Sequence, residues 1–80
     1  MMKQVYKFSA TWCTPCKVLT NMLAKEGITL PEYDVGNPDI KGLMNKYNIK
    51  SVPTVVVDED GIITTFTGLG SFPKLLAAVK

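Results

Sequence analysis

The two cysteines of the chain stand three residues apart, in the run Trp12-Cys13-Thr14-Pro15-Cys16. On the first turn of a helix, residues i and i+3 share a face, so the two sulfurs can close a small disulfide with little backbone movement. A helix N-terminus also favours a thiolate at Cys13, through its unpaired backbone N–H groups and its positive dipole end. Pro15 suits this turn, because its missing N–H would have no partner there in any case. The motif therefore predicts redox chemistry.

Two other interpretations of the cysteine pair are a metal site and an inert structural disulfide. A zinc or iron–sulfur site takes four ligands, usually cysteine or histidine. The chain has two cysteines and no histidine, so only a site shared between chains or completed by carboxylates could form. A structural disulfide across so short a loop removes little entropy from the unfolded chain. We therefore expect a redox-active pair that holds no metal and no other cofactor.

Length and composition predict a single domain, placed at 1–80. The formal charge of +2 comes from scattered lysines without a basic run, and the chain has no arginine. This composition gives no indication of binding to nucleic acid or membranes. No apolar run reaches membrane-spanning length, and the segment before the first predicted strand is too short for a signal peptide. We therefore expect a monomer in the reducing cytoplasm. In that compartment a C-x-x-C pair is more often catalytic than structural.

Hydrophobic periodicity predicts an α/β chain with the element order β-α-β-α-β-β-α. The predicted strands are 5–10, 32–35, 52–57 and 62–66, and the predicted helices start near 14, 37 and 71. Gly27 and Asn48 are expected to end the first two helices, and Ser71 to cap the third. Asp60-Gly61 is a hairpin signal between the last two strands, which makes them antiparallel. The first two strands should be parallel, because a helix connects them.

The chain resembles the thioredoxin family over nearly its whole length. The run from Trp12 to Lys17 is similar to that family's active-site signature, with Thr14 where thioredoxins usually have glycine. The stretches 33–35, 37–38 and 47–49 resemble the region between the family's central strands, and Val52-Pro53-Thr54 is similar to its cis-proline loop. The resemblance implies a compact thioredoxin-like fold, with a four-stranded mixed sheet and three helices. Small redoxins of phage or archaeal type are similar in size.

The resemblance implies different roles for the two cysteines. Cys13 would be the exposed nucleophile, whose thiolate attacks a target disulfide, and Cys16 the buried thiol that resolves the mixed disulfide. Thr14 would tune the pair: a hydroxyl beside the sulfur can donate a hydrogen bond to the thiolate and make the pair less reducing than the glycine version.

The resemblance also implies a surface for the substrate around the sulfurs. Trp12 would cap the site and offer an apolar platform, and Gly68 would close it. A cis Val52-Pro53 bond would leave the backbone of Val52 free to pair with an extended substrate strand. The same proline would keep an unwanted metal from capturing the thiols.

Lys7 departs from the family's pattern. It occupies the place where thioredoxins carry a buried aspartate thought to relay protons for the resolving cysteine. One interpretation is a strand-edge lysine whose ammonium group extends to water. The other is a positive charge that stabilises the thiolate of Cys16 or Cys13. A charged lysine cannot act as a base, so water or the departing thiolate would take the proton.

The leading functional hypothesis is a dithiol–disulfide oxidoreductase that reduces protein disulfides, with ribonucleotide reductase as a client by family analogy. Its electron donor would be a flavin-dependent, NADPH-fed thioredoxin reductase. One alternative is a glutaredoxin-like protein reduced by glutathione, although the usual Cys-Pro-Tyr-Cys motif is absent and residues 68–71 only loosely resemble a glutathione-binding loop. Another alternative is a thioredoxin-fold binding module in which the cysteines are incidental.

Overall fold

The computed structural model describes residues 3–79, and its elements follow the predicted order. The strands are β1 (Lys3–Ser9), β2 (Glu32–Asp34), β3 (Thr54–Glu59) and β4 (Ile62–Thr67), and the helices are α1 (Thr14–Lys25), α2 (Lys41–Lys46) and α3 (Phe72–Val79). Two 3₁₀ turns, at Pro38–Ile40 and Leu69–Ser71, lead into α2 and α3. The predicted α/β class and its β-α-β-α-β-β-α order are confirmed.

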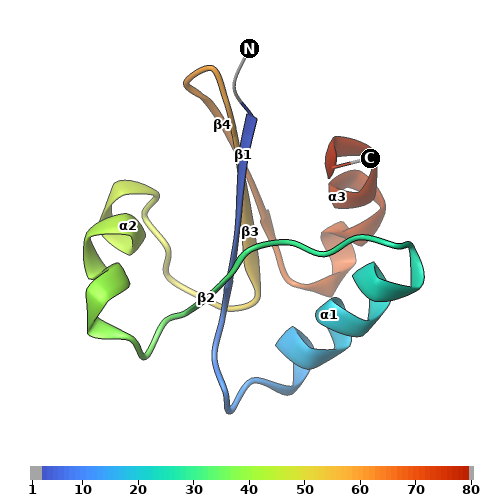
Figure 1. Cartoon of the computed structure of the whole chain (residues 1–80), viewed down its shortest axis with the longest axis horizontal. Coiled ribbons are helices and arrows are strands. Elements are labelled where there is room, and N and C mark those ends of the chain that lie inside the picture. Colours follow the sequence, from blue (N-terminus) through green and yellow to red (C-terminus); the bar gives the residue numbers. More distant parts are fainter. Residues whose placement is uncertain (1–2, 80) are drawn as a thin grey trace.

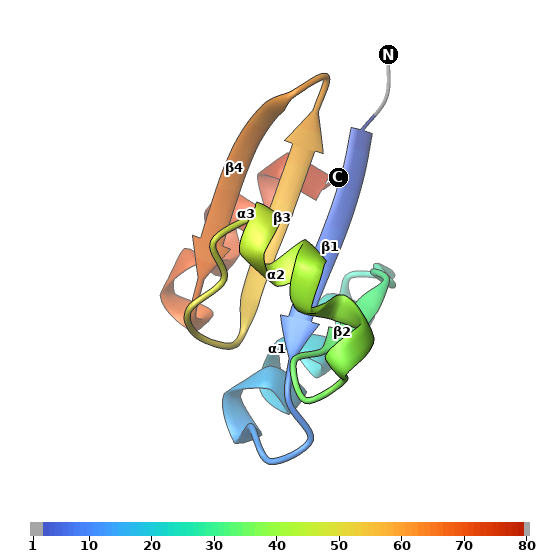
Figure 2. The ribbon, with the colours of Figure 1, turned by 90° about the vertical axis from the view of Figure 1, so that its left-hand side faces the viewer.

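The four strands form one mixed sheet in the order β2-β1-β3-β4. As predicted, β1 and β2 are parallel and β3 and β4 are antiparallel, while β1 and β3 pair antiparallel at the centre. Figure 1 views the sheet nearly edge-on, with α2 on one side and with α1 and α3 on the other. Figure 2 shows β4 along one edge of the sheet, beside β3.

Each face of the sheet has its own hydrophobic core, because successive side chains of a strand point to opposite faces. Under α1 and α3, buried Leu19, Leu23 and Leu75 pack on Val55 of β3. Under α2, the buried residues are Phe8, Tyr47 and Val56. The central strands β1 and β3 are thus buried on both faces. This packing fixes the position of the end of β1, which leads into the cysteine motif.

The ends of α1 and α2 are closed in the same way. Gly27 has a φ of +73° and Asn48 a φ of +56°, the left-handed conformation that commonly follows a helix. The next residue in each case, Ile28 or Ile49, donates its N–H to a carbonyl in the last turn of the helix. The predicted stops at Gly27 and Asn48 are confirmed.

Some predicted boundaries were wrong. The first strand begins at Lys3 instead of residue 5 and ends at Ser9, because pairing with β3 extends to its first residues. Ser71 precedes α3, but its hydroxyl donates to the carbonyl of Thr67 instead of accepting from the helix.

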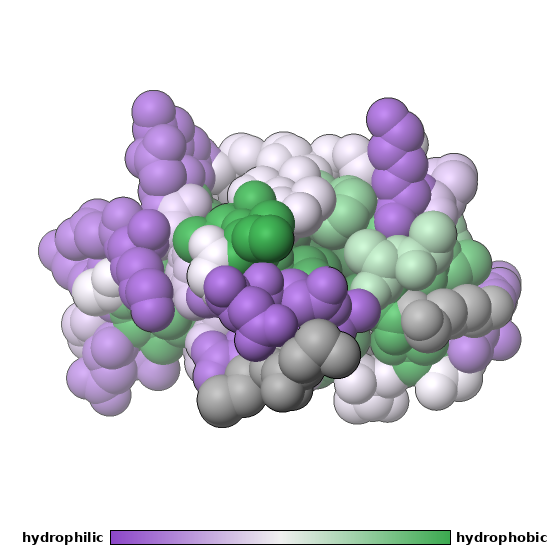
Figure 3. All heavy atoms as spheres, turned by 90° about the horizontal axis from the view of Figure 1, so that it is seen from above, coloured by the Kyte–Doolittle hydropathy of each residue, from purple (hydrophilic) through white to green (hydrophobic). Residues whose placement is uncertain are grey.

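The molecular surface carries hydrophobic groups at one end. Figure 3 views the molecule from the end with the β3–β4 hairpin, where strongly hydrophobic atoms reach the surface among hydrophilic ones. Ile62 and Ile63, at the start of β4, are both exposed. Within residues 3–79, no helix is long and apolar enough to cross a membrane.

Candidate redox site

The cysteine motif lies where β1 ends and α1 begins. Cys13 is the N-cap of α1 and is disulfide-bonded to Cys16, with 5.3 Å between the two Cα atoms. The N–H of Cys16 donates to Sγ of Cys13 at 3.2 Å, so the sulfur takes the place of a capping oxygen. A negative charge that develops on this sulfur meets a backbone donor and the positive end of the helix dipole. The predicted helix N-terminus is therefore confirmed, and it is built to favour a thiolate at Cys13.

The two cysteines are almost equally buried in this disulfide-bonded form. Cys13 is 4% exposed and Cys16 is 3% exposed. Both pack with Ala10 of the preceding loop and contact the half-buried Val35 and Val52. The expectation that Cys13 is exposed and only Cys16 buried is wrong for this form, because the loops after β2 and α2 cover both sulfurs.

Trp12 stands beside the disulfide and is 77% exposed. It forms one wall of a hollow of about 370 Å³, whose other lining residues are Val35, Met44, Ile49, Lys50, Ser51 and Val52. The hollow is mostly apolar, and it adjoins Val35 and Val52, which touch the cysteines. The predicted apolar platform therefore lies next to the sulfurs, and α2 and the loop after it supply the rest of it.

The predicted cis-proline loop and closing glycine lie together. The Val52–Pro53 peptide bond is cis, and the carbonyl of Pro53 accepts a hydrogen bond from the N–H of Gly68 at 3.0 Å. Gly68 has a φ of +76°, which favours glycine over other residues. Within residues 3–79, the backbone groups of Val52 make no hydrogen bond. The loop thus presents a free peptide group next to the cysteines.

Thr14 and Pro15 occupy the first turn of α1, and both are exposed. Among the described residues, the hydroxyl of Thr14 makes no hydrogen bond, and the sulfur of Cys13 is already bonded to the N–H of Cys16. The tuning role of Thr14 in the reduced protein stays a prediction.

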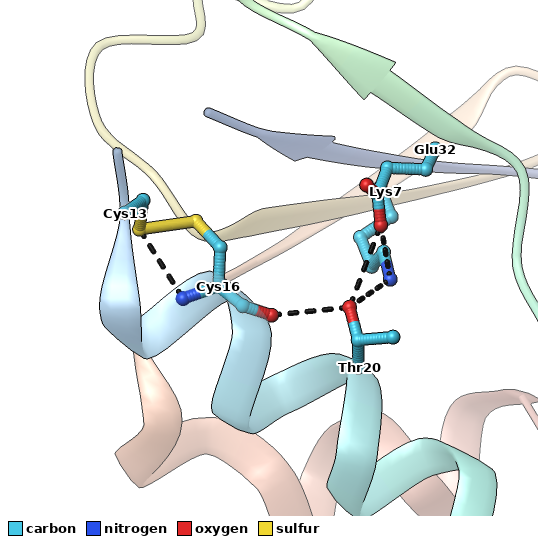
Figure 4. A network of polar contacts seen from close by, with 5 residues as sticks. All are labelled: Lys7, Cys13, Cys16, Thr20 and Glu32. Carbon is cyan, nitrogen blue, oxygen red and sulfur yellow. Dashed lines mark hydrogen bonds and ion pairs between the residues drawn. A yellow bond between two sulfur atoms is a disulfide. The ribbon is translucent and has the colours of Figure 1, made fainter. Parts of the chain in front are cut away.

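Lys7 lies in the middle of the molecule and is only 3% exposed. It sits on central strand β1, on the face covered by α1, and its ammonium group meets Oε1 of Glu32 at 2.7 Å and Oγ1 of Thr20 at 2.6 Å (Figure 4). The hydroxyl of Thr20 in turn donates to the carbonyl of Cys16 at 3.1 Å. The interpretation of Lys7 as a strand-edge lysine that reaches water is therefore wrong. Its charge is neutralised inside the fold and is linked to the cysteine turn through one hydroxyl.

The carboxylate of Glu32 has a perturbed acidity. Its hydrogen bond from Lys7 holds the pKa of Glu32 below the usual value, although partial burial acts in the opposite direction. The Glu32 side chain is half exposed, so its outer side remains in contact with water. The ion pair is therefore buried at its lysine end and solvated at its glutamate end.

A second hollow, of about 300 Å³, lies on this side of the site. It is lined by Ser9, Ala10, Thr11, Cys16, Lys17, Thr20, Glu32 and Asp34. Most of these residues are polar, which distinguishes this hollow from the apolar one beside Trp12. The two hollows give the cysteine turn a polar flank and an apolar flank.

Sequence reasoning missed Thr20 and Glu32 as parts of the site. Thr20 was one polar position on an amphipathic helix, and Glu32 was the first residue of a short predicted strand. The available signal was Lys7 itself: a lysine inside an apolar strand requires a carboxylate on a neighbouring element. Only the parallel register, which places Lys7 opposite Glu32, identifies that carboxylate.

Titration of the reduced thiols distinguishes the effect of the Lys7 charge from that of the Glu32 charge. We expect Lys7→Met to change the pKa of the Cys16 thiol by less than about half a unit, because Glu32 balances the ammonium charge in the parent and water solvates the half-exposed Glu32 carboxylate in the variant. Glu32→Gln leaves that ammonium charge unbalanced and should lower the pKa of the same thiol. The measurement is the pH dependence of the rate of thiol alkylation at Cys16, followed by mass spectrometry. A rise of one unit or more in Lys7→Met would show instead that the lysine acts directly on the sulfur.

The comparisons with known proteins agree with this geometry. The thioredoxin family model matches residues 2–80. Mouse mitochondrial thioredoxin is 32% identical over 81 residues, which cover 95% of this chain and 49% of that protein. Mouse DnaJ homolog subfamily C member 10 is 35% identical over 77 residues, which cover 91% of this chain and 10% of that protein. The chain thus spans about half of the first relative and about a tenth of the second.

Solved structures with the same fold include a thioredoxin from Malassezia sympodialis (Mala s 13), described as a member of a pan-allergen family. It superposes with a TM-score of 0.74 at 28% identity, and the match covers 95% of this chain and 70% of that chain. The four-stranded mixed sheet with three helices described above is therefore a thioredoxin-like fold.

Proposed function

The chain belongs to the thioredoxin family, and we propose that it is a thiol–disulfide oxidoreductase that reduces disulfide bonds in other proteins. The observation that carries this proposal is the Cys13–Cys16 disulfide at the N-terminus of α1, with a backbone donor on the sulfur of Cys13. This arrangement stabilises the thiolate that begins an exchange, and it keeps the second sulfur within reach to complete it.

The proposed reaction transfers two electrons in two exchange steps. The Cys13 thiolate attacks one sulfur of the client disulfide, forms a mixed disulfide and releases the first client thiolate. The Cys16 thiol then gives its proton to water and attacks Sγ of Cys13. This second attack closes the Cys13–Cys16 bond and releases the second client thiolate. The client is reduced, and the chain returns to the disulfide-bonded form described above.

The client would bind along the apolar flank of the site. Trp12 and the hollow beside it offer a surface for an apolar side chain next to the client cystine. The free backbone groups of Val52 suit hydrogen bonds to an extended client segment, and the backbone at Gly68 lies next to the same loop. Specificity would then come from the client's shape near the cystine more than from charge, because Lys50 is the only charged residue among residues 3–79 that lines this hollow.

The electron donor in this proposal is a flavin-dependent thioredoxin reductase fed by NADPH, and the protein works in the cytoplasm. Ribonucleotide reductase is a suitable client, since it needs a dithiol donor in that compartment. A cytoplasmic site is consistent with the chemistry, because a reducing compartment keeps such a pair available as a dithiol.

The reduction potential of the Cys13–Cys16 pair tests the direction of the reaction. The protein is equilibrated in defined thiol buffers, and the free thiols are trapped and counted by mass spectrometry. A potential near the value of about −270 mV known for thioredoxin supports a reductant. A value near about −200 mV favours glutathione as the donor, and one near about −120 mV favours an oxidant.

A double replacement, Cys13→Ser with Cys16→Ser, tests the binding-module alternative. The proposed oxidoreductase loses all exchange activity in this variant, while its fold and its Trp12 surface remain. A protein that acts by docking alone keeps its biological effect. Retained effect in the double variant would therefore overturn the proposal.

Thr14 is predicted to make the pair less reducing than a glycine in its place. In Thr14→Gly, the Cys13 thiolate loses a donor worth about 1.4 kcal/mol, so we expect the potential to become more negative by about 30 mV. The same thiol-buffer equilibration measures the change, with Thr29→Gly as a control outside the site. The prediction fails if both the potential and the pKa of the Cys13 thiol are unchanged.

A further inference from the structure

The outer edge of β4 is an open strand edge. In the sheet, β4 pairs with β3 on one side, and no strand within residues 3–79 pairs with its other side. The six residues of β4, Ile62–Thr67, include no charged residue, no proline and no glycine. Such an edge presents unpaired N–H and C=O groups and is a template for pairing with another chain.

The opposite edge of the sheet, formed by β2, is protected against pairing with another chain. The open edge is therefore specific to β4. There, β2 has only three residues, and two of them are the exposed acids Glu32 and Asp34. A short, charged edge strand discourages pairing with another chain. The sheet can therefore be extended at β4 and not at β2.

Hydrophobic side chains accompany the open edge. Ile62 is 74% exposed and Ile63 is 48% exposed, at the start of β4. Beside Ile62, on the face that α3 covers, lies a hollow of about 210 Å³ lined by Lys3, Val57, Glu59, Ile62, Thr64, Phe66 and Ala78. Figure 2 shows this edge of the sheet, where β4 is the outermost strand. Ile62 lies on this face of the sheet and Ile63 on the opposite face, so each face of the open edge carries an exposed apolar side chain that a second protein surface can cover.

We propose that two copies of this chain associate through antiparallel pairing of their β4 strands, which joins the two sheets into one of eight strands. The occupant is a second copy because β4 is complementary to itself in one register. The twofold axis of such a dimer is perpendicular to the sheet, so the two copies turn the same face of their sheets to the same side. Because the even-numbered residues of β4 share one face, Ile62 must lie opposite an even-numbered residue of the second copy.

The register follows from the position of the axis. With the axis at Thr64, Ile62 lies opposite Phe66 of the second copy, Ile63 lies opposite Thr65, and Thr67 lies opposite Gly61 of the hairpin turn. With the axis at Thr65, Ile62 would lie opposite Gly68, so this exposed isoleucine would have no side chain to pair with. The first register pairs an exposed isoleucine with an aromatic side chain on the face of the hollow, and such cross-strand pairs stabilise sheets.

Charge and geometry also suit this dimer. Because β4 is uncharged, the pairing brings no like charges together, and Asp60 comes opposite Gly68 of the second copy. The antiparallel arrangement places the two Cys13–Cys16 pairs at opposite ends of the joined sheet. Both redox sites remain open to clients, so this association differs from the monomer expected from the sequence without opposing the proposed chemistry.

Sedimentation equilibrium over a concentration series tests the dimer. The full chain is expected to show a mass rising from 8.8 kDa to twice that value. In Thr64→Lys, two ammonium groups face each other across the axis, so we expect dimerisation to weaken about tenfold. Thr64→Glu is expected to do the same, and an equal mixture of the two variants should recover the dimer, because lysine then faces glutamate.

A matched control is Thr29→Lys, which adds the same charge at an exposed threonine outside the sheet and should leave dimerisation unchanged. Because the Thr64 side chain is exposed, both variants are expected to keep the thermal unfolding midpoint of the parent. A monomeric parent at every concentration overturns the proposal. So does a Thr64→Lys variant that dimerises as tightly as the parent, or a mixture that fails to recover the dimer.

Discussion

Replacement of Cys16 with serine should reduce turnover to the uncatalysed rate and leave the chain joined to its client. In this variant Cys13 still attacks the client disulfide, but nothing removes the mixed disulfide that results. The reduced variant is mixed with a disulfide-containing protein, and the covalent complex is then counted on a non-reducing gel and by mass spectrometry. A nearly quantitative complex, reversed by added dithiol, is the expected result.

Cys13→Ser is the matched control, and it should give neither turnover nor a complex. The comparison is informative because the two cysteines are equally buried in the disulfide-bonded form, so burial does not identify the nucleophile. The assignment rests instead on the helix N-cap position of Cys13 and on the N–H of Cys16 that donates to its sulfur. If Cys13→Ser traps the client and Cys16→Ser does not, the two roles are reversed.

The second large effect concerns the free energy of unfolding. We expect the two residues of the Lys7–Glu32 ion pair to differ in what their replacement costs. Glu32→Gln should destabilise the protein by about 1–3 kcal/mol, because it leaves the buried ammonium group of Lys7 without a counter-charge. Lys7→Met should be neutral or stabilise by up to about 2 kcal/mol, since it places an apolar side chain of similar length in the same site. Glu32 is half exposed, and water can solvate its carboxylate once the lysine is gone.

The chain provides its own control for this measurement. Lys3 and Glu59 also face each other on neighbouring strands, 4.0 Å apart, but both side chains are exposed. Glu59→Gln should change the free energy of unfolding by less than about 0.5 kcal/mol. Urea unfolding of the three variants and the parent decides the matter. Equal losses in Glu32→Gln and Glu59→Gln would mean that the burial of Lys7 has no energetic consequence.

Low pH should lower the stability of the parent protein by protonating the carboxylate of Glu32. The pKa of Glu32 is lowered by its hydrogen bond from Lys7, so the folded state holds the proton less tightly than the unfolded chain does. The resulting stability is present above the ordinary glutamate pKa of about 4.5, and it is lost as the pH falls through the lowered value. Glu32→Gln removes this contribution and should flatten the acid limb of the stability curve.

Local sequence signals predicted the positions that depend on neighbours along the chain. The N-terminus of α1, the stops at Gly27 and Asn48 and the Asp60-Gly61 hairpin all follow from capping and turn chemistry within a few residues. The cysteine spacing belongs to the same class, because one helical turn brings the sulfurs together.

The surroundings of the cysteines were decided by contacts between distant segments. The loops after β2 and α2 bring Val35 and Val52 over the sulfurs, and no local pattern encodes the resulting burial of Cys13. The mistaken interpretation of Lys7 has the same origin. A lysine in a strand looks solvent-exposed until the pairing of β1 with both neighbours places it at the centre of the sheet.

The sequence by itself determined the fold class and the redox pair of this protein, because periodicity, capping residues and a three-residue spacing act over one or two turns of chain. Tertiary structure alone decided that Lys7 is buried against Glu32, that both cysteines are covered, and that β4 lies at an open edge of the sheet. These features depend on strand order and register, which follow from the packing of the whole sheet and not from any single segment.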